Sequence, residues 1–191
     1  MTAEESIRSI AGAKAAIDNG FSRVGRRLAE GDAAARWLHA GAGRAVALCD
    51  AIVLLCRGQH GPEAAAPARA AIQLAADLCW LARLPRRERL AALELDARSG
   101  DWGAVWSQSR LRERLKAAGW TEQELEERLG DAARLCAAMS AGGGDRLPWA
   151  HAFSIPPEPR VAAEEVLVAG ARALRDIVQA LGARWPGCFA L

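Results

Sequence analysis

The spacing of apolar residues constrains the fold of this chain more than any other feature. Apolar side chains recur at steps of three or four residues over 7–28, 125–139 and 161–181, which is the period of a helix with one buried face. Apolar residues make up 51% of the 191 residues, much of it alanine and leucine, and β-branched residues are few. This mixture favours helix over strand. We therefore predict an all-α, single-domain bundle of about six or seven helices.

Capping and breaking signals predict where the first helices begin and end. Thr2 followed by Glu5 is a capping-box pattern, and it opens a first helix that we expect to run to about Glu30. Gly31 and Asp32 then offer a break and a new N-cap. Two glycines, at 41 and 43, interrupt the apolar run over 33–57. That run is either one kinked helix or two helices.

The rest of the chain divides at prolines and glycines. We predict a turn in "RGQHGP", helices over about 67–84, 85–98, 102–118, 121–139 and 160–183, and a Gly- and Pro-rich loop over about 141–159. Thr121 with Glu124 is a second capping box. A long loop in a compact domain is either mobile or functional. The bundle domain is expected to span 1–184, with 185–191 as a C-terminal tail.

Charge, cysteine content and hydropathy narrow the class of protein. A formal net charge of +2 is too small to indicate a nucleic-acid binder by itself, and the local arginine clusters are typical of solvated helix faces. Five cysteines without a Cys-x-x-Cys pair are typical of small core residues in a reducing compartment. The most apolar stretch, "AVALCDAIVLLC", is short and contains Asp50. With no signal peptide recognisable, we expect a soluble, cytoplasmic protein that does not bind a membrane.

A polar stripe lies on an otherwise apolar helix. In "PARAAIQLAADLCWLARL", Arg69, Gln73 and Asp77 follow each other at four-residue steps, so they form one column on the helix surface. If the column faces solvent, the helix is simply amphipathic. If it faces protein, each group must be paired, because an unpaired buried charge costs several kcal/mol, roughly the order of the stability of a whole domain.

Asp50 is the expected partner of this stripe. It sits in the most apolar part of the preceding helix, and an antiparallel hairpin brings the two helices together. A buried pair between Asp50 and Arg69 would satisfy both groups. The network of Asp50, Arg69, Gln73 and Asp77 would then either fix the packing register of the bundle or line a small pocket.

The run from Gly61 to Trp106 resembles a family. Its sequence, "GPEAAAPARAAIQLAADLCWLARLPRRERLAALELDARSGDWGAVW", is similar to uncharacterised bacterial helical-bundle families of the HEPN-like kind, in which a core helix bears Arg-x-x-x-Glu. Arg69 matches the arginine, and Gln73 stands where the family has glutamate. The resemblance implies a helical bundle that acts on RNA, in a toxin or defence setting. The missing carboxylate puts an acid, base or metal role at Gln73 in doubt.

A second element of this resemblance lies in the long loop. HEPN-type ribonucleases carry an arginine followed by four to six residues and a histidine, and "RLPWAH" places Arg146 and His151 at that separation. In that chemistry the arginine holds the scissile phosphate and the histidine moves the proton of a 2′-hydroxyl attack. Pro148 lies between them, which departs from the helical setting of the family motif. The alternative is that Trp149 and His151 pack the loop against the bundle.

Two function hypotheses of different classes remain. The first is a HEPN-like protein that acts on RNA, as a ribonuclease or a degenerate one, with Arg146 and His151 as the catalytic pair. The second is a non-catalytic protein that binds a small molecule or assembles into a homo-oligomer through an apolar helix face. Trp102 and Trp106 lie four residues apart and form the expected aromatic patch for a partner or ligand. The histidines have no metal-ligand spacing, so we predict no metal and no cofactor.

Overall fold

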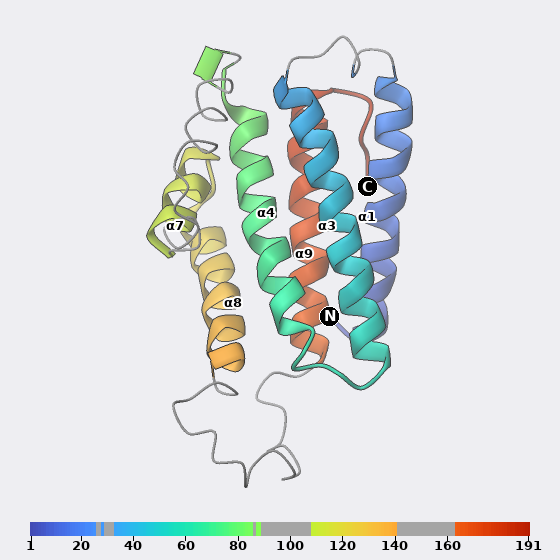
Figure 1. Cartoon of the computed structure of the whole chain (residues 1–191). Coiled ribbons are helices and arrows are strands. Elements are labelled where there is room, and N and C mark those ends of the chain that lie inside the picture. Colours follow the sequence, from blue (N-terminus) through green and yellow to red (C-terminus); the bar gives the residue numbers. More distant parts are fainter. Residues whose placement is uncertain (26–27, 29–32, 86, 89–107, 141–162) are drawn as a thin grey trace, which may run out of the picture.

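Six helices make up the part of the chain that the computed structural model describes, namely residues 1–25, 28, 33–85, 87–88, 108–140 and 163–191 (Figure 1). No strand occurs in these ranges, and the all-α prediction is confirmed. The helices are α1 (Ala3–Val24), α3 (Ala33–Arg57), α4 (Ala65–Arg83), α7 (Gln108–Ala117), α8 (Glu122–Ser140) and α9 (Ala163–Arg184).

The C-terminal helix α9 is the centre of the bundle. It packs against α1, α3 and α4, and α3 also packs against α4 (Figure 1). The pair α7 and α8 forms a hairpin on the outer side of α4. The molecule is therefore a four-helix core of α1, α3, α4 and α9 with a two-helix layer added to one side.

Local signals at the helix ends behave as the sequence predicts in two cases. At α1, the backbone N–H of Thr2 donates to Glu5 Oε2 at 2.8 Å and the N–H of Glu5 donates to Thr2 Oγ1 at 3.2 Å. Thr121 and Glu124 form the same reciprocal pair at the start of α8, at 2.9 and 3.3 Å. Both capping boxes are confirmed.

The predicted end of the first helix is wrong. Helix α1 ends at Val24 instead of near Glu30, because Gly25 adopts a φ of 49° that no helix can continue through. By contrast, α3 runs unbroken through both of its glycines. A Cβ at Gly41 would lie 2.8 Å from Leu78 Cδ2 on α4. Gly41 therefore permits close approach of the two helices instead of breaking α3.

Small residues let the other helices approach α9 closely. A Cβ at Gly170 would lie 3.1 Å from Ile52 Cδ1 on α3, and the Cys49 thiol lies 3.6 Å from the carbonyl oxygen of Gly170. On the α4 side, Cys79 lies 3.5 Å from the carbonyl oxygen of Asp176. Burial raises the pKa of both thiols to about 12. These cysteines are small core residues, as the sequence predicts.

The C-terminal tail is part of the core. Phe189 is 7% exposed and packs over Gly20 of α1, where an added Cβ would overlap its ring. Arg23 Nη1 donates to the carbonyl oxygen of Cys188 at 3.3 Å. In Figure 1 the chain after α9 turns back along the bundle beside α1. Residues 185–191 thus cover one end of the apolar interior.

Candidate functional site

The polar stripe of α4 turns towards protein over its C-terminal part. Gln73 is 6% exposed, and the Asp77 side chain is 18% exposed. Arg69, at the N-terminal end of the stripe, is half-buried. A solvated amphipathic face would leave Gln73 exposed. Of the two predicted orientations of the stripe, the one that faces protein is therefore correct for Gln73 and Asp77.

Arg114 of α7 supplies the positive charge for this stripe. Its Nη1 forms a short ion pair with Asp77 Oδ1, and Gln73 Nε2 donates to the same oxygen at 3.2 Å. The Arg114 guanidinium also lies 5.5 Å from the ring centre of Trp80, a cation–π geometry. The stripe is therefore matched by a residue from a later helix and not from the preceding one.

The prediction for Asp50 is wrong. Its side chain is 53% exposed, and its carboxylate pairs with Lys14 Nζ of α1 at 2.6 Å. The rotation of α3 about its axis explains the difference. Cys49 and Ile52 point into the core, so Asp50 points towards α1 and solvent. Asp50 is thus a surface ion pair and not the buried partner of Arg69.

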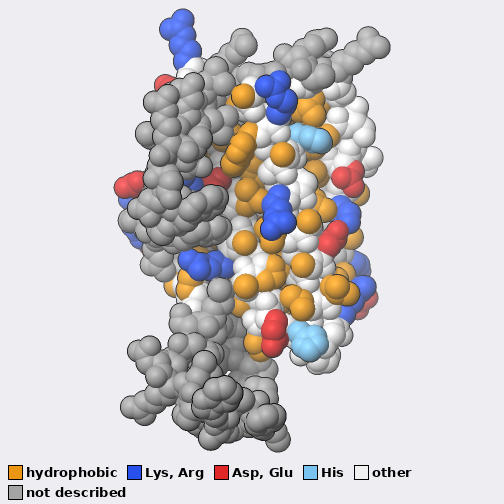
Figure 2. All heavy atoms as spheres, in the orientation of Figure 1, with side chains coloured by type: hydrophobic (Ala, Val, Ile, Leu, Met, Phe, Trp, Pro, Cys, Tyr) orange, Lys and Arg blue, Asp and Glu red, His pale blue; other side chains and the backbone are white. Residues whose placement is uncertain are grey.

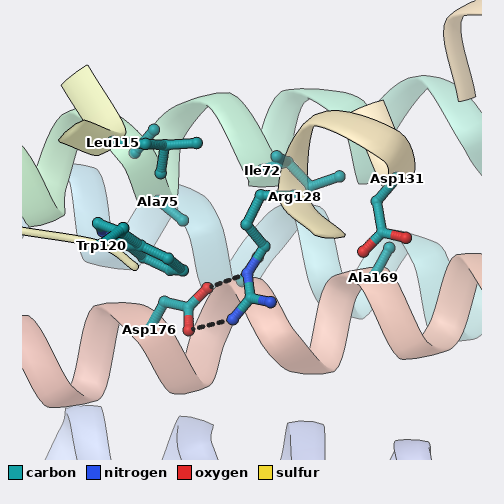
Figure 3. Close-up of a pocket in the computed structure, with 10 residues that line it drawn as sticks. Ile72, Ala75, Leu115, Trp120, Arg128, Asp131, Ala169 and Asp176 are labelled. Atoms are coloured by element: carbon teal, nitrogen blue, oxygen red, sulfur yellow. Dashed lines mark hydrogen bonds and ion pairs between the residues drawn. The ribbon is translucent and has the colours of Figure 1, made fainter. Parts of the chain in front are cut away.

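A fully formed buried ion pair joins α8 to α9 (Figure 3). Arg128 Nε and Nη2 donate to the two carboxylate oxygens of Asp176, each at 2.9 Å. The side chains are 13% and 7% exposed. Trp120 covers the guanidinium, with 4.8 Å from Arg128 Cζ to the ring centre. Burial raises the pKa of the Asp176 carboxyl, and the hydrogen bonds from Arg128 oppose that rise.

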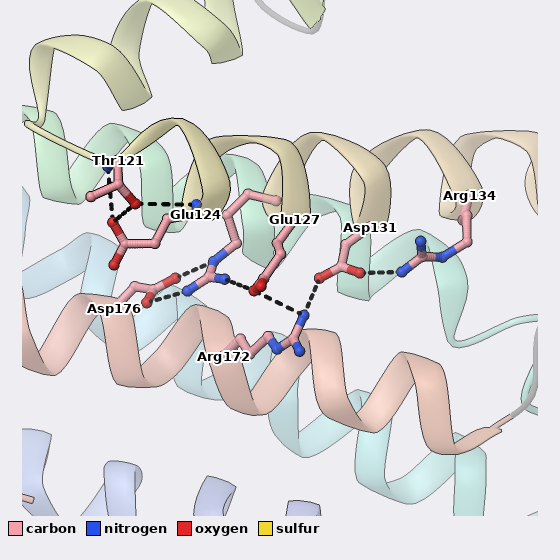
Figure 4. A network of polar contacts seen from close by, with 8 residues as sticks. Thr121, Glu124, Glu127, Asp131, Arg134, Arg172 and Asp176 are labelled. Atoms are coloured by element: carbon pink, nitrogen blue, oxygen red, sulfur yellow. Dashed lines mark hydrogen bonds and ion pairs between the residues drawn. The ribbon is translucent and has the colours of Figure 1, made fainter. Parts of the chain in front are cut away.

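Further charges extend this contact along the two helices (Figure 4). Asp131 of α8 is 7% exposed and accepts a hydrogen bond from Arg172 of α9 at 3.2 Å. Asp131 also forms a short ion pair with Arg134. Glu127 lies 3.4 Å from Arg128 and 3.8 Å from Arg172. Each buried carboxylate in this network therefore has an arginine beside it.

We use the name polar seam for the charged groups that hold the outer hairpin on α4 and α9. They are Asp77, Arg114, Arg128, Asp131, Arg172 and Asp176. A cavity of about 10 Å³ lies beside them, between α4, α8 and α9 (Figure 3). Such a space is about the size needed for one water molecule. The seam is suited to fixing the register of the hairpin and is too tightly closed to hold a metabolite.

Several predicted site residues lie outside the described residues. These are Arg146, His151, Trp102 and Trp106. Their proposed roles as a catalytic pair and an aromatic patch stay predictions from the sequence. Within the described ranges, no three His, Cys, Asp or Glu side chains come together. The predicted lack of a metal likewise stays a prediction.

Sequence reasoning missed four residues of the polar seam that are buried or nearly so, namely Arg114, Arg128, Asp131 and Asp176. Asp176 is an acidic residue next to the apolar pair Ile177 and Val178, a weaker form of the signal that singled out Asp50. Only the rotation of each helix against its neighbours decides which of the two aspartates is buried. Charge pattern identifies both as candidates, and tertiary packing separates them.

The outward side of α3 carries an apolar strip between charged residues. By length and composition alone, helix α3 is long and apolar enough to span a membrane. Core helices of soluble proteins also meet this criterion. In this structure, 33% of the most apolar stretch of α3 is buried. Leu54 is 73% exposed. Figure 2 shows hydrophobic side chains spread over the face that α3 and α4 form, with few charged groups between them. We call the residues Ala40, Gly43, Ala47, Ala51 and Leu54 the α3 face.

Comparison with known proteins does not indicate a family or a function for this chain. No family model, curated protein or solved structure matches the chain. The HEPN-like resemblance therefore stays a hypothesis that rests on the sequence motifs alone.

Proposed function

We propose that this protein is a non-catalytic assembly protein that forms a homodimer through the α3 face. The observation that carries the proposal is the exposure of Leu54, at 73%, on a helix whose composition suits full burial. An apolar strip along an exposed helix is normally covered by a partner. In the monomer, α1, α4 and α9 cover only one side of α3. A second copy of the chain would cover the other.

The size of the face supports a dimer with contributions from neighbouring helices. Helix α3 has 25 residues, which corresponds to a length of about 37 Å. Stable interfaces bury about 800 Å² on each partner. A single strip of small side chains falls short of that area, so exposed side chains of α4 would complete the interface.

The order of residues along the α3 face favours an antiparallel arrangement. Ala40 and Leu54 lie seven residues before and after Ala47. In an antiparallel pair that crosses at Ala47, Leu54 meets the hollow that small residues leave around Ala40 of the partner subunit. Small side chains at the crossing also let the two backbones approach closely.

Charge supports the same arrangement. Arg44 and Asp50 lie three residues on either side of Ala47, and both are exposed. An antiparallel pair sets Arg44 level with Asp50 of the partner subunit, whereas a parallel pair sets each charge level with its own copy. Opposite charges at one level are favourable and like charges are not.

The mass of the protein in solution tests this proposal. We expect analytical ultracentrifugation to give the mass of a dimer for the wild type and of a monomer for Ala47→Arg, because that substitution places two guanidinium groups at the crossing point. Ala137→Arg is the matched control, since Ala137 is an exposed alanine on α8 of the outer hairpin, and it should leave the dimer intact. A wild-type monomer at all concentrations would refute the proposal, and flotation of that monomer with lipid vesicles would assign the α3 face to a membrane instead.

Cross-linking tests the antiparallel arrangement. In a mixture of the variants Ala40→Cys and Leu54→Cys, mild oxidation should link Cys at 40 of one copy to Cys at 54 of the other. Each variant alone should remain without a cross-link. Efficient linking of Leu54→Cys to itself would indicate a parallel dimer and contradict the arrangement while leaving self-association in place.

A further inference from the structure

A groove runs between α1 and α3, separate from the polar seam. Its volume is about 400 Å³, and it is lined by Ile17, Asp18, Phe21, Ser22, Leu28, His39 and Gly43. Both helices pack against α9 more closely than against each other, which leaves space between them. The space beside Gly43 is open, because an added Cβ there would meet nothing within 4 Å. The volume lies within the range of about 300 to 1,000 Å³ found for small-molecule sites.

The floor of the groove is held in place by an aromatic cluster. Phe21 lies at its centre, with His39 edge-on at 4.6 Å, Phe189 at 5.0 Å and Trp185 at 5.9 Å between ring centres. These are edge-to-face contacts, the preferred geometry of aromatic pairs. Phe21 is therefore fixed by its neighbours, and a ligand would meet a preformed apolar wall.

The polar groups of the groove define its charge. Asp18 is exposed and is the one formally charged side chain among the described residues that line the groove. The Ser22 hydroxyl donates to the backbone oxygen of Asp18 at 2.9 Å, so its oxygen is left as an acceptor. These groups together offer a carboxylate and a hydroxyl oxygen beside aromatic and aliphatic side chains. That combination suits a cation with an apolar body.

We propose that the groove binds a small organic amine that carries an aromatic or branched apolar group. The ammonium group pairs with Asp18, and the apolar group lies against Phe21 and Leu28. This inference goes beyond the proposed assembly function. The two sites share only Gly43, which lines the groove and also belongs to the α3 face, whereas the groups that contact the ligand, Asp18 and Phe21, belong to α1.

Three probes of the same shape and different charge test the charge preference. Protein NMR would follow the full-length chain titrated with 2-phenylethylamine, 2-phenylethanol or phenylacetate at neutral pH. We expect the amine to shift the resonances of Phe21, His39 and Gly43, the alcohol to bind more weakly, and the carboxylate to bind least. Tighter binding of phenylacetate than of the amine, or no shift at millimolar concentration, would overturn the proposal.

Three variants separate a specific site from non-specific association. Asp18→Asn should weaken binding of the amine by about fivefold, the scale of one exposed charge contact, and leave binding of the alcohol unchanged. Glu63→Gln removes an exposed carboxylate that lies before α4 and outside the groove lining, and it should have no effect. Ser22→Leu places a larger side chain in the groove from α1, outside the α3 face, so it should abolish binding in a folded protein. Equal binding by wild type and Asp18→Asn would remove the role assigned to the carboxylate and with it the proposed ligand class.

Discussion

Two aspartates that each lie on a helix of the four-helix core have opposite environments in this protein. Asp50 lies in the apolar part of α3 and ends at the surface beside Lys14, with half of its side chain exposed. Asp176 lies in the apolar part of α9 and is 6% exposed, held by two hydrogen bonds from Arg128. The energetic consequences differ accordingly, because water screens the first pair and not the second.

Replacement of each aspartate by asparagine measures that difference. We expect Asp176→Asn to lower the free energy of unfolding by about 3 kcal/mol, because the buried guanidinium of Arg128 loses its counter-charge. Asp50→Asn should cost less than about 1 kcal/mol, as is typical of exposed ion pairs. Urea denaturation of the two variants and the wild type provides the measurement. Equal losses would show that the α8 to α9 contact is open to water.

The buried thiols predict a specific dependence of stability on high pH. Burial raises the pKa of Cys49 and Cys79 from 9.0 to about 12. The folded state therefore keeps protons that the unfolded state releases, so the free energy of unfolding should fall as pH rises from 9.0 towards 12. Burial also raises the pKa of Cys56, while the chain has no tyrosine and its only lysines are Lys14 and Lys116.

A variant without these two thiols provides the test. The wild type and the double variant Cys49→Ala/Cys79→Ala would each be denatured at about pH 8 and at about pH 10. The quantity compared is the change in the free energy of unfolding between the two pH values, and not its absolute value. The double variant should lose clearly less stability between the two values. The same loss in both proteins would mean that the two thiols ionise freely in the folded state.

At the scale of a helix, α1 shows how one fold uses glycine in two ways. Gly20 lies under the ring of Phe189, and an added Cβ would overlap that ring. Gly12, two turns earlier, is exposed, and a Cβ there would meet nothing within 4 Å. The first glycine is required by packing, and the second only weakens the helix.

Alanine substitution distinguishes the two glycines. Gly12→Ala should raise the free energy of unfolding by up to about 1 kcal/mol, because alanine is the better helix former. Gly20→Ala should lower it by about 1 to 3 kcal/mol, because the Phe189 ring must move. Thermal unfolding followed by circular dichroism gives both values. Stabilisation by Gly20→Ala would contradict the packing of the C-terminal segment against α1.

Helix ends divide into those that local sequence predicts and those it does not. The boxes at Thr2 and Thr121 use residues three positions apart, so their hydrogen bonds form wherever a helix starts there. Gly25 and Gly41 carry no such local signal. One ends α1 and the other lies inside α3, and the difference depends on the backbone conformation and on the neighbour that each glycine meets.

At the scale of the whole molecule, the buried charges lie between layers. The core around α9 is formed by apolar and small side chains, whereas the outer hairpin is held by the polar seam. Apolar contacts tolerate sliding, while a bidentate ion pair has one good geometry. The seam therefore gives the hairpin a defined position on the core.

The ribonuclease hypothesis makes a prediction for the intact protein. It rests on the spacing of Arg146 and His151, whereas the proposed assembly function expects no RNA cleavage that depends on them. Labelled single-stranded RNA would be incubated with wild type and with His151→Ala, with His60→Ala as a matched control. If the wild type and His60→Ala cleave the RNA and His151→Ala does not, the protein is a ribonuclease and our proposal of a non-catalytic function is wrong.

The sequence by itself determined the all-α class, the two capping boxes and the burial of four of the five cysteines. These features depend on apolar period and on residues within one turn of each other, and both are local. Only the tertiary structure decided that Asp77 pairs with Arg114, that Asp176 and not Asp50 is buried, and that Phe189 closes one end of the bundle. Each of these depends on how helices distant in sequence rotate against one another, and many rotations satisfy the same apolar pattern equally well.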